Sequence, residues 1–295
     1  MTTQAIRPVR KAVFPVAGMG TRFLPATKAV PKEMLPVVDK PVIQYAVEEA
    51  KAAGIEQFIF VTGRGKHIIE DHFDHAYELE ALLESRDKTS ELNSLLEALP
   101  TTGSVSFTRQ QQPLGLGHAV WCARHFVGDE PFAVLLPDEL LVDQPGCLEA
   151  MNTAYSEVGG NVIAVREVPQ EETKRYGIIT PDGDGKGDFI AVRGIVEKPT
   201  PDKAPSRLAV IGRYILQPQV FAELERHERG AGDEIQLTDA LARLIGHGPF
   251  HALRFHGQRY DCGDKVGFLQ ANVAIGLSRP DTAGPLREIL KQLKL

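Results

Sequence analysis

The sequence has few cysteines, and it lacks any long apolar run. Its three cysteines, Cys122, Cys147 and Cys262, are odd in number and do not have the spacing of metal ligands, which argues against a disulfide framework and a zinc site. No apolar stretch approaches the about 18–20 residues that span a bilayer, and the N-terminus lacks the apolar segment of a signal peptide. We therefore expect a cytoplasmic protein without membrane contact.

Acidic residues outnumber basic ones, so the 295 residues carry a formal net charge of −6 and the pI is near 5.9. This balance argues against general nucleic-acid binding. The N-terminal segment is an exception, because six cationic residues precede the first acidic one, Glu33. They are Arg7, Arg10, Lys11, Arg22, Lys28 and Lys32. A local excess of positive charge in an acidic protein indicates an anionic ligand.

The cationic segment contains a glycine-bearing run, Ala17–Arg22, directly after the apolar run Ala12–Val16. Glycine amides at the carboxyl end of a strand lie where ligands bind in open α/β sheets, and a ligand can approach them closely. We interpret the run as a nucleotide-triphosphate loop, with Arg22 and Lys32 offsetting the phosphate charge. An ordinary strand-to-loop turn would also explain two glycines. A third glycine is missing at Phe23 and no Gly-Lys-Ser/Thr follows, which disfavours a dinucleotide fingerprint and a P-loop.

Apolar runs alternate with helical patterns over the first half of the chain. The predicted strands are Lys11–Val16, Gln57–Thr62, Val105–Thr108, Phe132–Leu136 and Asn161–Arg166. The predicted helical segments are Pro41–Ala53, His67–Leu99, Leu116–Phe126 and Cys147–Val158. Repeated strand–helix–strand units imply an α/β fold with a Rossmann-like, mostly parallel or mixed sheet flanked by helices. Residues 8–166 form its nucleotide-binding half.

The pattern changes after Val168 to a predicted hairpin, Tyr176–Thr180 and Phe189–Glu197, around a Pro-Asp-Gly turn. The other predicted elements are strands at Arg207–Leu216 and Phe250–Phe255 and helices at Gln217–Arg229, Ile235–Ile245, Lys265–Ile275 and Pro285–Lys294. No repeat or low-complexity segment divides the chain. We expect a single domain, 1–295, in which 167–264 form a second half and 265–295 the C-terminal helices.

The run from Gly18 to Pro36 resembles the signature of the sugar-nucleotide pyrophosphorylases, the nucleotidyltransferases that make NDP-sugars. Later blocks resemble the uridylyl and glucose branch of this family. They are Arg109-Gln110, Gly115–Val120, Leu136-Pro137-Asp138, Tyr176–Ile179, Val196–Pro199 and Tyr260–Gly263. Because the blocks occur in order along nearly the whole chain, the resemblance is more specific than any single block.

The resemblance implies a direct displacement in which the phosphate of glucose-1-phosphate attacks the α-phosphorus of UTP, giving UDP-glucose and pyrophosphate. Such a reaction needs no enzyme nucleophile, so catalysis reduces to positioning two anions and neutralising their charge. Another nucleotide such as dTTP, or another sugar, remains an alternative. So do a glycosyltransferase, which would not need the Arg22 and Lys32 loop, and a catalytically silent regulatory subunit. Relatives of this kind imply a homo-oligomer, a dimer or a tetramer.

By the same resemblance, Arg22 and Lys32 hold the triphosphate and Lys198 holds the sugar phosphate. Gln110 pairs with the edge of the uracil. The implied main-chain contacts to the nucleotide come from Ala17, Gly18, Gly20 and Gly115. His118 falls in the predicted helix after Gly115, and we interpret it as a packed, neutral histidine.

On the sugar side, the resemblance implies that Glu197 accepts hydrogen bonds from glucose hydroxyls and that Gly177 lets the backbone approach the ring. Residues 167–264 are then the sugar-binding half. A surface ion pair between Glu197 and Lys198 would be the simpler explanation of those two residues, and it would have little energetic value.

The implied cofactor is Mg²⁺, held by Asp138 and Asp261. Asp138 follows an apolar strand, and Mg²⁺ in nucleotide sites takes one or two carboxylates together with phosphate oxygens. Alternatively, Asp138 is a turn residue and Asp261 caps the helix that begins near Lys265. Glu139 and Asp264 are neighbouring candidates for the same role. We interpret Cys262 as packed.

Overall fold

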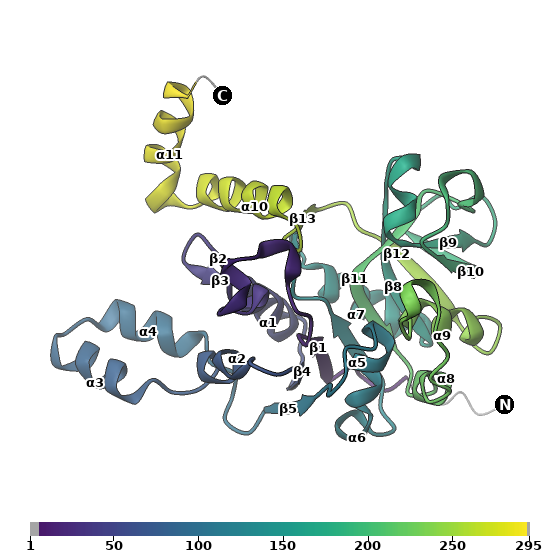
Figure 1. The fold of residues 1–295 in the computed structure, drawn as a ribbon, viewed down its shortest axis with the longest axis horizontal. Helices are drawn as coiled ribbons and strands as arrows, with labels where there is room; N and C mark the ends of the chain where they lie inside the picture. Colours follow the sequence, from purple (N-terminus) through teal and green to yellow (C-terminus); the bar gives the residue numbers. More distant parts are fainter. Residues whose placement is uncertain (1–5, 294–295) are drawn as a thin grey trace.

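The computed structural model describes residues 6–293, and one nine-stranded sheet organises this part of the chain (Figure 1). Its strand order is β5-β4-β1-β6-β11-β8-β12-β10-β9. The first four of these strands run parallel to one another. They are β1 (Lys11–Pro15), β4 (Gln57–Thr62), β5 (Val105–Arg109) and β6 (Phe132–Leu135). Their carboxyl ends meet at one edge of the sheet, where ligands bind in open α/β folds.

The remaining strands make the sheet mixed. They are β8 (Asn161–Glu167), β9 (Gly177–Pro181), β10 (Phe189–Glu197), β11 (Leu208–Leu216) and β12 (Phe250–Arg254). Strand β12 runs parallel to β8, whereas β9–β10, β10–β12, β6–β11 and β8–β11 are antiparallel. The predicted α/β class with a mixed sheet is confirmed. The predicted hairpin is also present, since β9 and β10 pair antiparallel. A short connection between two neighbouring strands permits only this direction of pairing.

The two predicted halves interlock within this sheet. Strand β11, which belongs to 167–264, lies between β6 and β8, which belong to 8–166. Its backbone pairs Arg213 with Leu135 on one side and Val210 with Val165 on the other. The boundary near residue 166 therefore separates stretches of sequence but does not divide the sheet.

Helices cover both faces of the sheet. They are α1 (Val42–Ala52), α2 (His67–His72), α3 (Tyr77–Ser85), α4 (Thr89–Glu97), α5 (Leu116–Cys122), α6 (Arg124–Val127), α7 (Cys147–Val158), α8 (Val220–Leu224), α9 (Leu237–Leu244), α10 (Lys265–Ser278) and α11 (Pro280–Gln292). The predicted stretch 67–99 divides into α2, α3 and α4, of which α3 and α4 form an arm extending from the body (Figure 1). The helix predicted over 217–229 is only α8. Helix α11 begins at Pro280 rather than Pro285, and Lys294 lies outside the described residues.

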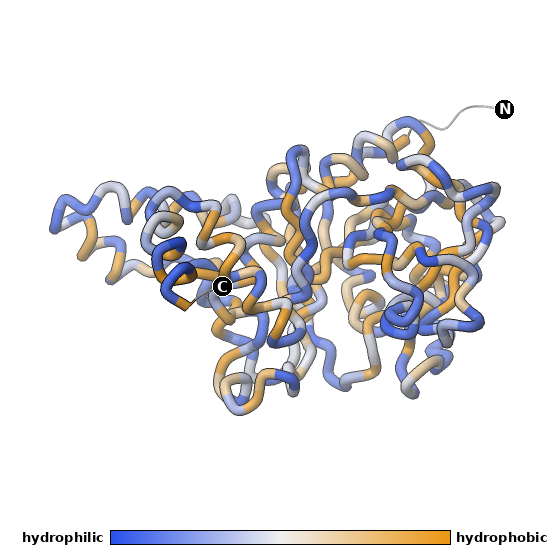
Figure 2. The backbone as a smooth tube through the Cα atoms, turned by 90° about the horizontal axis from the view of Figure 1, so that it is seen from above, coloured by the Kyte–Doolittle hydropathy of each residue, from blue (hydrophilic) through white to orange (hydrophobic). Residues whose placement is uncertain are grey.

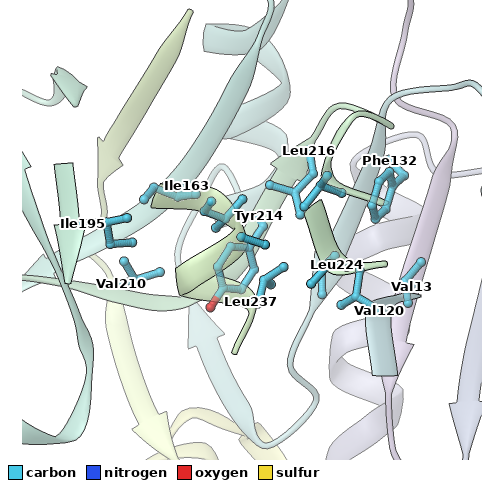
Figure 3. Packing of buried hydrophobic residues seen from close by; sticks show 14 of the residues in the cluster. Val13, Val120, Phe132, Ile163, Ile195, Val210, Tyr214, Leu216, Leu224 and Leu237 are labelled. Atoms are coloured by element: carbon cyan, nitrogen blue, oxygen red, sulfur yellow. The ribbon is translucent and has the colours of Figure 1, made fainter. Parts of the chain in front are cut away.

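The core follows from the alternation of side chains along the strands. On β1, Val13 enters a cluster with residues of α5, α8 and α9, whereas Phe14 enters a cluster on the opposite face with residues of α1 and α7. Figure 3 shows the first cluster, with Tyr214 among its aliphatic neighbours. In Figure 2 the apolar positions gather in the body of the molecule and alternate with hydrophilic ones along the α3–α4 arm. Packing on both faces holds the sheet in place, and with it the edge at which the site lies.

Two small sheets, absent from our predictions, complete the edge of the fold. Strand β7 (Glu139–Val142) pairs antiparallel with β13 (Gln258–Asp261), and β2 (Pro36–Val37) pairs with β3 (Lys40–Pro41). The β7–β13 pairing continues into the Cys262 amide, which donates to the main-chain oxygen of Asp138 at 2.8 Å. It therefore places the chain around Asp261 beside the end of β6. Among the described residues, no helix is long and apolar enough to cross a membrane.

Candidate active site

The loop after β1 presents main-chain amides at the sheet edge. It runs through three 3-10 turns, Thr21–Phe23, Ala26–Lys28 and Lys32–Met34. Gly20 adopts a left-handed conformation with φ 65°, which glycine adopts without steric cost, and Thr27 Oγ1 donates to its carbonyl at 2.7 Å. Within residues 6–293, the N–H groups of Gly18, Met19 and Gly20 have no protein acceptor. Unpartnered amides in consecutive residues of one loop suit an anion.

Three adjoining hollows of about 330, 430 and 380 Å³ form one continuous cleft along this edge. The first and second share the lining residues Ala17, Gly18, Met19, Gln110 and Pro113. The second and third share Leu116, Leu136, Asp138 and Glu234. We call this feature the cleft. Each hollow is within the size range of small-molecule sites, and together they are large enough for two substrates side by side.

Lys32 and Asp138 form an ion pair in the middle of the cleft, with Lys32 Nζ 2.5 Å from Asp138 Oδ2. Both side chains are largely buried, at 21 % and 26 % exposed. Burial opposes ionisation of Asp138, but the charge of Lys32, the hydrogen bond that Lys32 donates, a main-chain hydrogen bond and the charge of Arg22 together outweigh it and hold the pKa of this carboxyl below its usual value. Burial likewise opposes the Lys32 charge, and Asp138 with Glu33 raises the Lys32 pKa overall. The pair is therefore charged at neutral pH.

An oxygen of Asp138 and an oxygen of Asp261 both approach the position that a side chain at Gly263 would occupy. A Cβ placed there would lie 2.9 Å from Asp138 Oδ2, closer than real Cβ contacts allow, and 3.0 Å from Asp261 Oδ1, tighter than most of them. Glycine at this position therefore leaves the space into which both carboxylates project. Among the described residues, no group of three or more His, Cys, Asp and Glu side chains could hold a metal ion. Two carboxylates fit a cation that takes its remaining ligands from phosphate and water, as Mg²⁺ does.

The neighbouring carboxylates are occupied elsewhere. Glu139 binds the guanidinium of Arg259, with Oε1 2.7 Å from Nη2, and burial raises the Glu139 pKa although Arg259 opposes the rise. Asp264 caps α10, because its Oδ1 accepts from the amides of Val266 and Gly267 at 2.8 and 3.0 Å. The helix cap is thus Asp264 and not Asp261, which removes the alternative explanation of Asp261.

One end of the cleft is built from the segment between β5 and α5. Gln110 follows β5, is 9 % exposed, and donates from Nε2 to the carbonyl of Gly115 at 3.0 Å and toward His118 Nδ1 at 3.1 Å. Gly115 has φ 100°, and a Cβ there would lie 2.7 Å from Glu234 Cβ. Backbone conformation and close packing both require glycine at position 115. The tight packing holds the Gly115 carbonyl in place, and this carbonyl orients the Gln110 amide.

The other end of the cleft is built from the β9–β10 hairpin. Glu197 pairs in register with Gly177, and a Cβ on Gly177 would lie 3.2 Å from Glu197 Oε2. Lys198 Nζ lies 3.3 Å from Glu197 Oε1, and the Lys198 side chain is 45 % exposed. Lys198 also has φ 47°, a left-handed conformation that a non-glycine residue adopts at a cost. The end of the hairpin therefore has a strained backbone at Lys198, and the positively charged side chain of this residue lines the cleft.

The structure brings the predicted residues together with one exception. Gly20 turns the loop but is not among the residues that line the cleft. Arg22 lines the hairpin end of the cleft, together with Lys198, and donates to the Gly263 carbonyl at 3.4 Å. Our sequence analysis missed Arg175, whose Nη2 lies 3.2 Å from Asp261 Oδ2. Its only sequence signal is its position next to the Tyr176–Ile179 block. Also missed were the lining residues Glu234, Gln236 and Thr238.

Cys262 is packed as predicted. It is 2 % exposed, and burial, followed by the charges of Asp138 and Asp261, raises the pKa of its thiol to about 12. A thiol with this pKa is protonated at neutral pH and is therefore a poor nucleophile.

Residues 11–276 match the family described as Nucleotidyl transferase, so the chain belongs to the nucleotidyl transferases. Several individual proteins are also similar to this chain over most of its length. The UTP–glucose-1-phosphate uridylyltransferase of Komagataeibacter xylinus is 52 % identical over 261 residues, which cover 88 % of this chain and 92 % of the relative. The UTP-bound UGPase from Acinetobacter baumannii is 44 % identical, with a TM-score of 0.87, over 97 % of this chain and 99 % of that one. A UDP-glucose pyrophosphorylase complexed with UDP-glucose is 43 % identical, with a TM-score of 0.82, over 92 % of this chain and 100 % of that one. The predicted family is confirmed.

Proposed function

We propose that this chain transfers a uridylyl group from UTP to glucose-1-phosphate, releasing pyrophosphate and forming UDP-glucose. The observation that carries the proposal is the position of Asp138 and Asp261 in the cleft. Asp138 lines both the hollow that contains Gln110 and the hollow that contains Lys198, and Asp261 lines the second of these. In this proposal, the α-phosphate of a bound nucleotide meets the phosphate of a sugar beside these two carboxylates. The relatives named for this reaction, at up to 52 % identity, support the same assignment.

In this proposal, the chain supplies positioning and charge. The amide of Gly18 and the side chains of Arg22 and Lys32 hold the triphosphate, and Gly20 shapes the loop that carries them, so that the leaving pyrophosphate departs toward the cationic loop. The attacking oxygen of glucose-1-phosphate is already anionic, so no general base is required. The main task is to offset repulsion between two anions in a partly water-excluded cleft, where charges interact strongly.

Asp138 and Asp261 would hold Mg²⁺. When bound, the ion neutralises phosphate charge and aligns the reacting groups. Pairing with Lys32 keeps the Asp138 carboxylate ionised, and a bound cation would have to share or displace this contact at Oδ2. Arg175 contacts Asp261 and keeps that side chain near the cleft.

At the sugar end, Lys198 binds the sugar phosphate and Glu197 accepts hydrogen bonds from the sugar hydroxyls. Because Gly177 has no side chain beside the Glu197 carboxylate, where a Cβ would lie 3.2 Å from Oε2, a sugar ring can approach the hairpin closely. An exposed ion pair alone would contribute little energy, but the left-handed Lys198 backbone indicates that its direction matters.

A pyrophosphate-release panel tests the proposal. UTP, dTTP, ATP, CTP and GTP are each combined with several sugar-1-phosphates in the presence of Mg²⁺. We expect UTP with glucose-1-phosphate to give the highest kcat/KM. A clear preference for dTTP or ATP would contradict the nucleotide assignment, and binding of UTP without turnover of any pair would favour a silent regulatory subunit.

Three further expectations accompany this proposal. We infer that residues 1–295 form a single domain, that the protein is cytoplasmic, and that it assembles as a dimer or a tetramer. Sedimentation equilibrium of the purified protein measures the assembly state, and a monomer at micromolar concentration would contradict it.

A further inference from the structure

The protein itself fixes the orientation of the Gln110 amide. A main-chain carbonyl can only accept, so the Gln110 atom 3.0 Å from the Gly115 oxygen must be the NH₂ nitrogen. The same nitrogen lies 3.1 Å from His118 Nδ1. Its two hydrogens are therefore used by Gly115 and His118. The remaining polar atom of Gln110 is Oε1, which accepts no hydrogen bond from residues 6–293 although Gln110 lines the cleft.

This arrangement also determines which ring nitrogen of His118 carries the proton. A nitrogen that faces an NH₂ donor must be an acceptor, so Nδ1 carries no proton and the neutral ring is protonated on Nε2. The ring is 9 % exposed, stacks on Trp121 with centroids 5.8 Å apart, and meets the edge of His227 at 5.7 Å. Burial, followed by the charges of His227 and Arg124, lowers the His118 pKa below its ordinary value. The environment thus favours the neutral ring.

We propose that His118 is a specificity-determining positioning residue: by accepting from Gln110 Nε2, it presents Gln110 Oε1 to the base. This inference rests on the proposed uridylyl transfer. Uracil offers an N3–H donor that complements this oxygen. Cytosine has an unprotonated acceptor at N3, so its lone pair and those of Oε1 would repel each other. His118 therefore selects the base through Gln110, without touching the nucleotide.

The variant His118→Phe tests the proposal, because it removes the acceptor and keeps an aromatic ring on Trp121. We expect the ratio of kcat/KM for UTP to that for CTP to fall about three- to tenfold, the effect of losing one hydrogen bond. The change should lie in KM, since in this proposal Gln110 contacts the base and not the reacting phosphates. The ratio for UTP to dTTP should stay constant, because thymine has the same N3–H as uracil.

Two variants serve as controls. His118→Asn places an acceptor oxygen near the position of Nδ1 and should restore most of the UTP preference. His72→Phe is a matched change, since His72 is also a partly buried histidine beside a glutamine, with Nε2 3.1 Å from Gln44 Oε1, and it lies on α2, outside the residues that line the cleft. It should leave every nucleotide ratio unchanged.

An unchanged UTP-to-CTP ratio in folded His118→Phe would overturn the inference, as would an equal loss for UTP, dTTP and CTP. If the phenylalanine variant does not fold, ¹⁵N NMR of the wild-type ring decides the question. The Nε2–H tautomer supports the proposal, and the Nδ1–H tautomer or a charged ring at neutral pH overturns it. These outcomes remain distinct from failure of the proposed function, in which the wild-type protein itself would show no preference for UTP.

Discussion

Lys32 Nζ lies 2.5 Å from Asp138 Oδ2 and joins the cationic loop after β1 to the carboxylate that follows β6. The two residues are far apart in the sequence, and the predictions assigned Lys32 to the triphosphate and Asp138 to Mg²⁺. Their direct contact means that a bound cation and Lys32 would compete for the same carboxylate oxygen. Changes at either residue should therefore alter the dependence of the reaction on metal.

The variant Asp138→Asn should keep the fold and lose most of the activity. Asparagine retains the size of the side chain but removes the negative charge that a hard cation requires. We expect kcat/KM to fall on the order of 10²–10³-fold, with partial recovery at high Mg²⁺. Steady-state kinetics across a Mg²⁺ titration, with circular dichroism as a check on folding, measures both effects. A folded variant with normal activity and normal Mg²⁺ dependence would show that Asp138 is only a turn residue.

The double variant Asp138→Asn/Asp261→Asn should lose much less activity than the product of the two single losses. Both carboxylates face the space beside Gly263, so they would serve one ion and their effects are coupled. The four members of the double-mutant cycle are compared by kcat/KM at saturating Mg²⁺. Losses that simply multiply would indicate two independent roles.

Lys198→Ala and Lys32→Ala should affect different kinetic constants. Lys198 lies on the hairpin at the sugar end, so its removal should raise the KM for glucose-1-phosphate far more than that for UTP. Lys32 lies beside Asp138 at the centre of the cleft, so its removal should mainly lower kcat. Initial rates over a grid of both substrates separate the two patterns. Equal effects of both changes on both substrates would refute this division of roles.

Gly263→Ala should impair the site without large unfolding. The new methyl group would lie about 3 Å from an oxygen of Asp138 and an oxygen of Asp261. We expect a higher Mg²⁺ requirement and a lower kcat. Gly248→Ala is the matched control, because a Cβ at Gly248 meets nothing within 4 Å. If both alanine variants have the same Mg²⁺ dependence, the carboxylates do not share the space beside Gly263.

Arg213→Met should destabilise the whole protein. Arg213 is buried, binds both carboxylate oxygens of Glu49, and donates to the main-chain oxygens of Leu136 and Glu139 on either side of Asp138. Removing it leaves Glu49 largely buried and unpaired, which typically costs about 3–5 kcal/mol in the free energy of unfolding. Urea denaturation measures the change.

Arg207→Ala is the comparison for that variant, since it breaks a half-exposed pair with Glu167. Such pairs contribute about 0–1 kcal/mol. A similar, small loss of stability in both variants would show that the buried pair does not hold the end of β6 in place.

Local pattern determined much of the fold. The bounds predicted for Gln57–Thr62, Phe189–Glu197 and Cys147–Val158 are those of β4, β10 and α7. In each, the spacing of apolar residues matches the period of a strand or a helix, and that information is contained within the segment itself. The glycine loop was readable for the same reason, because an apolar strand runs directly into it. The ordered blocks along the chain were sufficient to identify the family.

Tertiary structure decided how these pieces meet. The short β7 and β13 strands carry little pattern of their own, and only their pairing brings Asp261 beside Asp138. The insertion of β11 between β6 and β8 likewise depends on contacts between distant segments. The sequence indicated that Gln110 faces a base. Which way its amide points was decided by the Gly115 carbonyl and the His118 ring, because hydrogen-bond direction depends on where the folded backbone places each donor and acceptor.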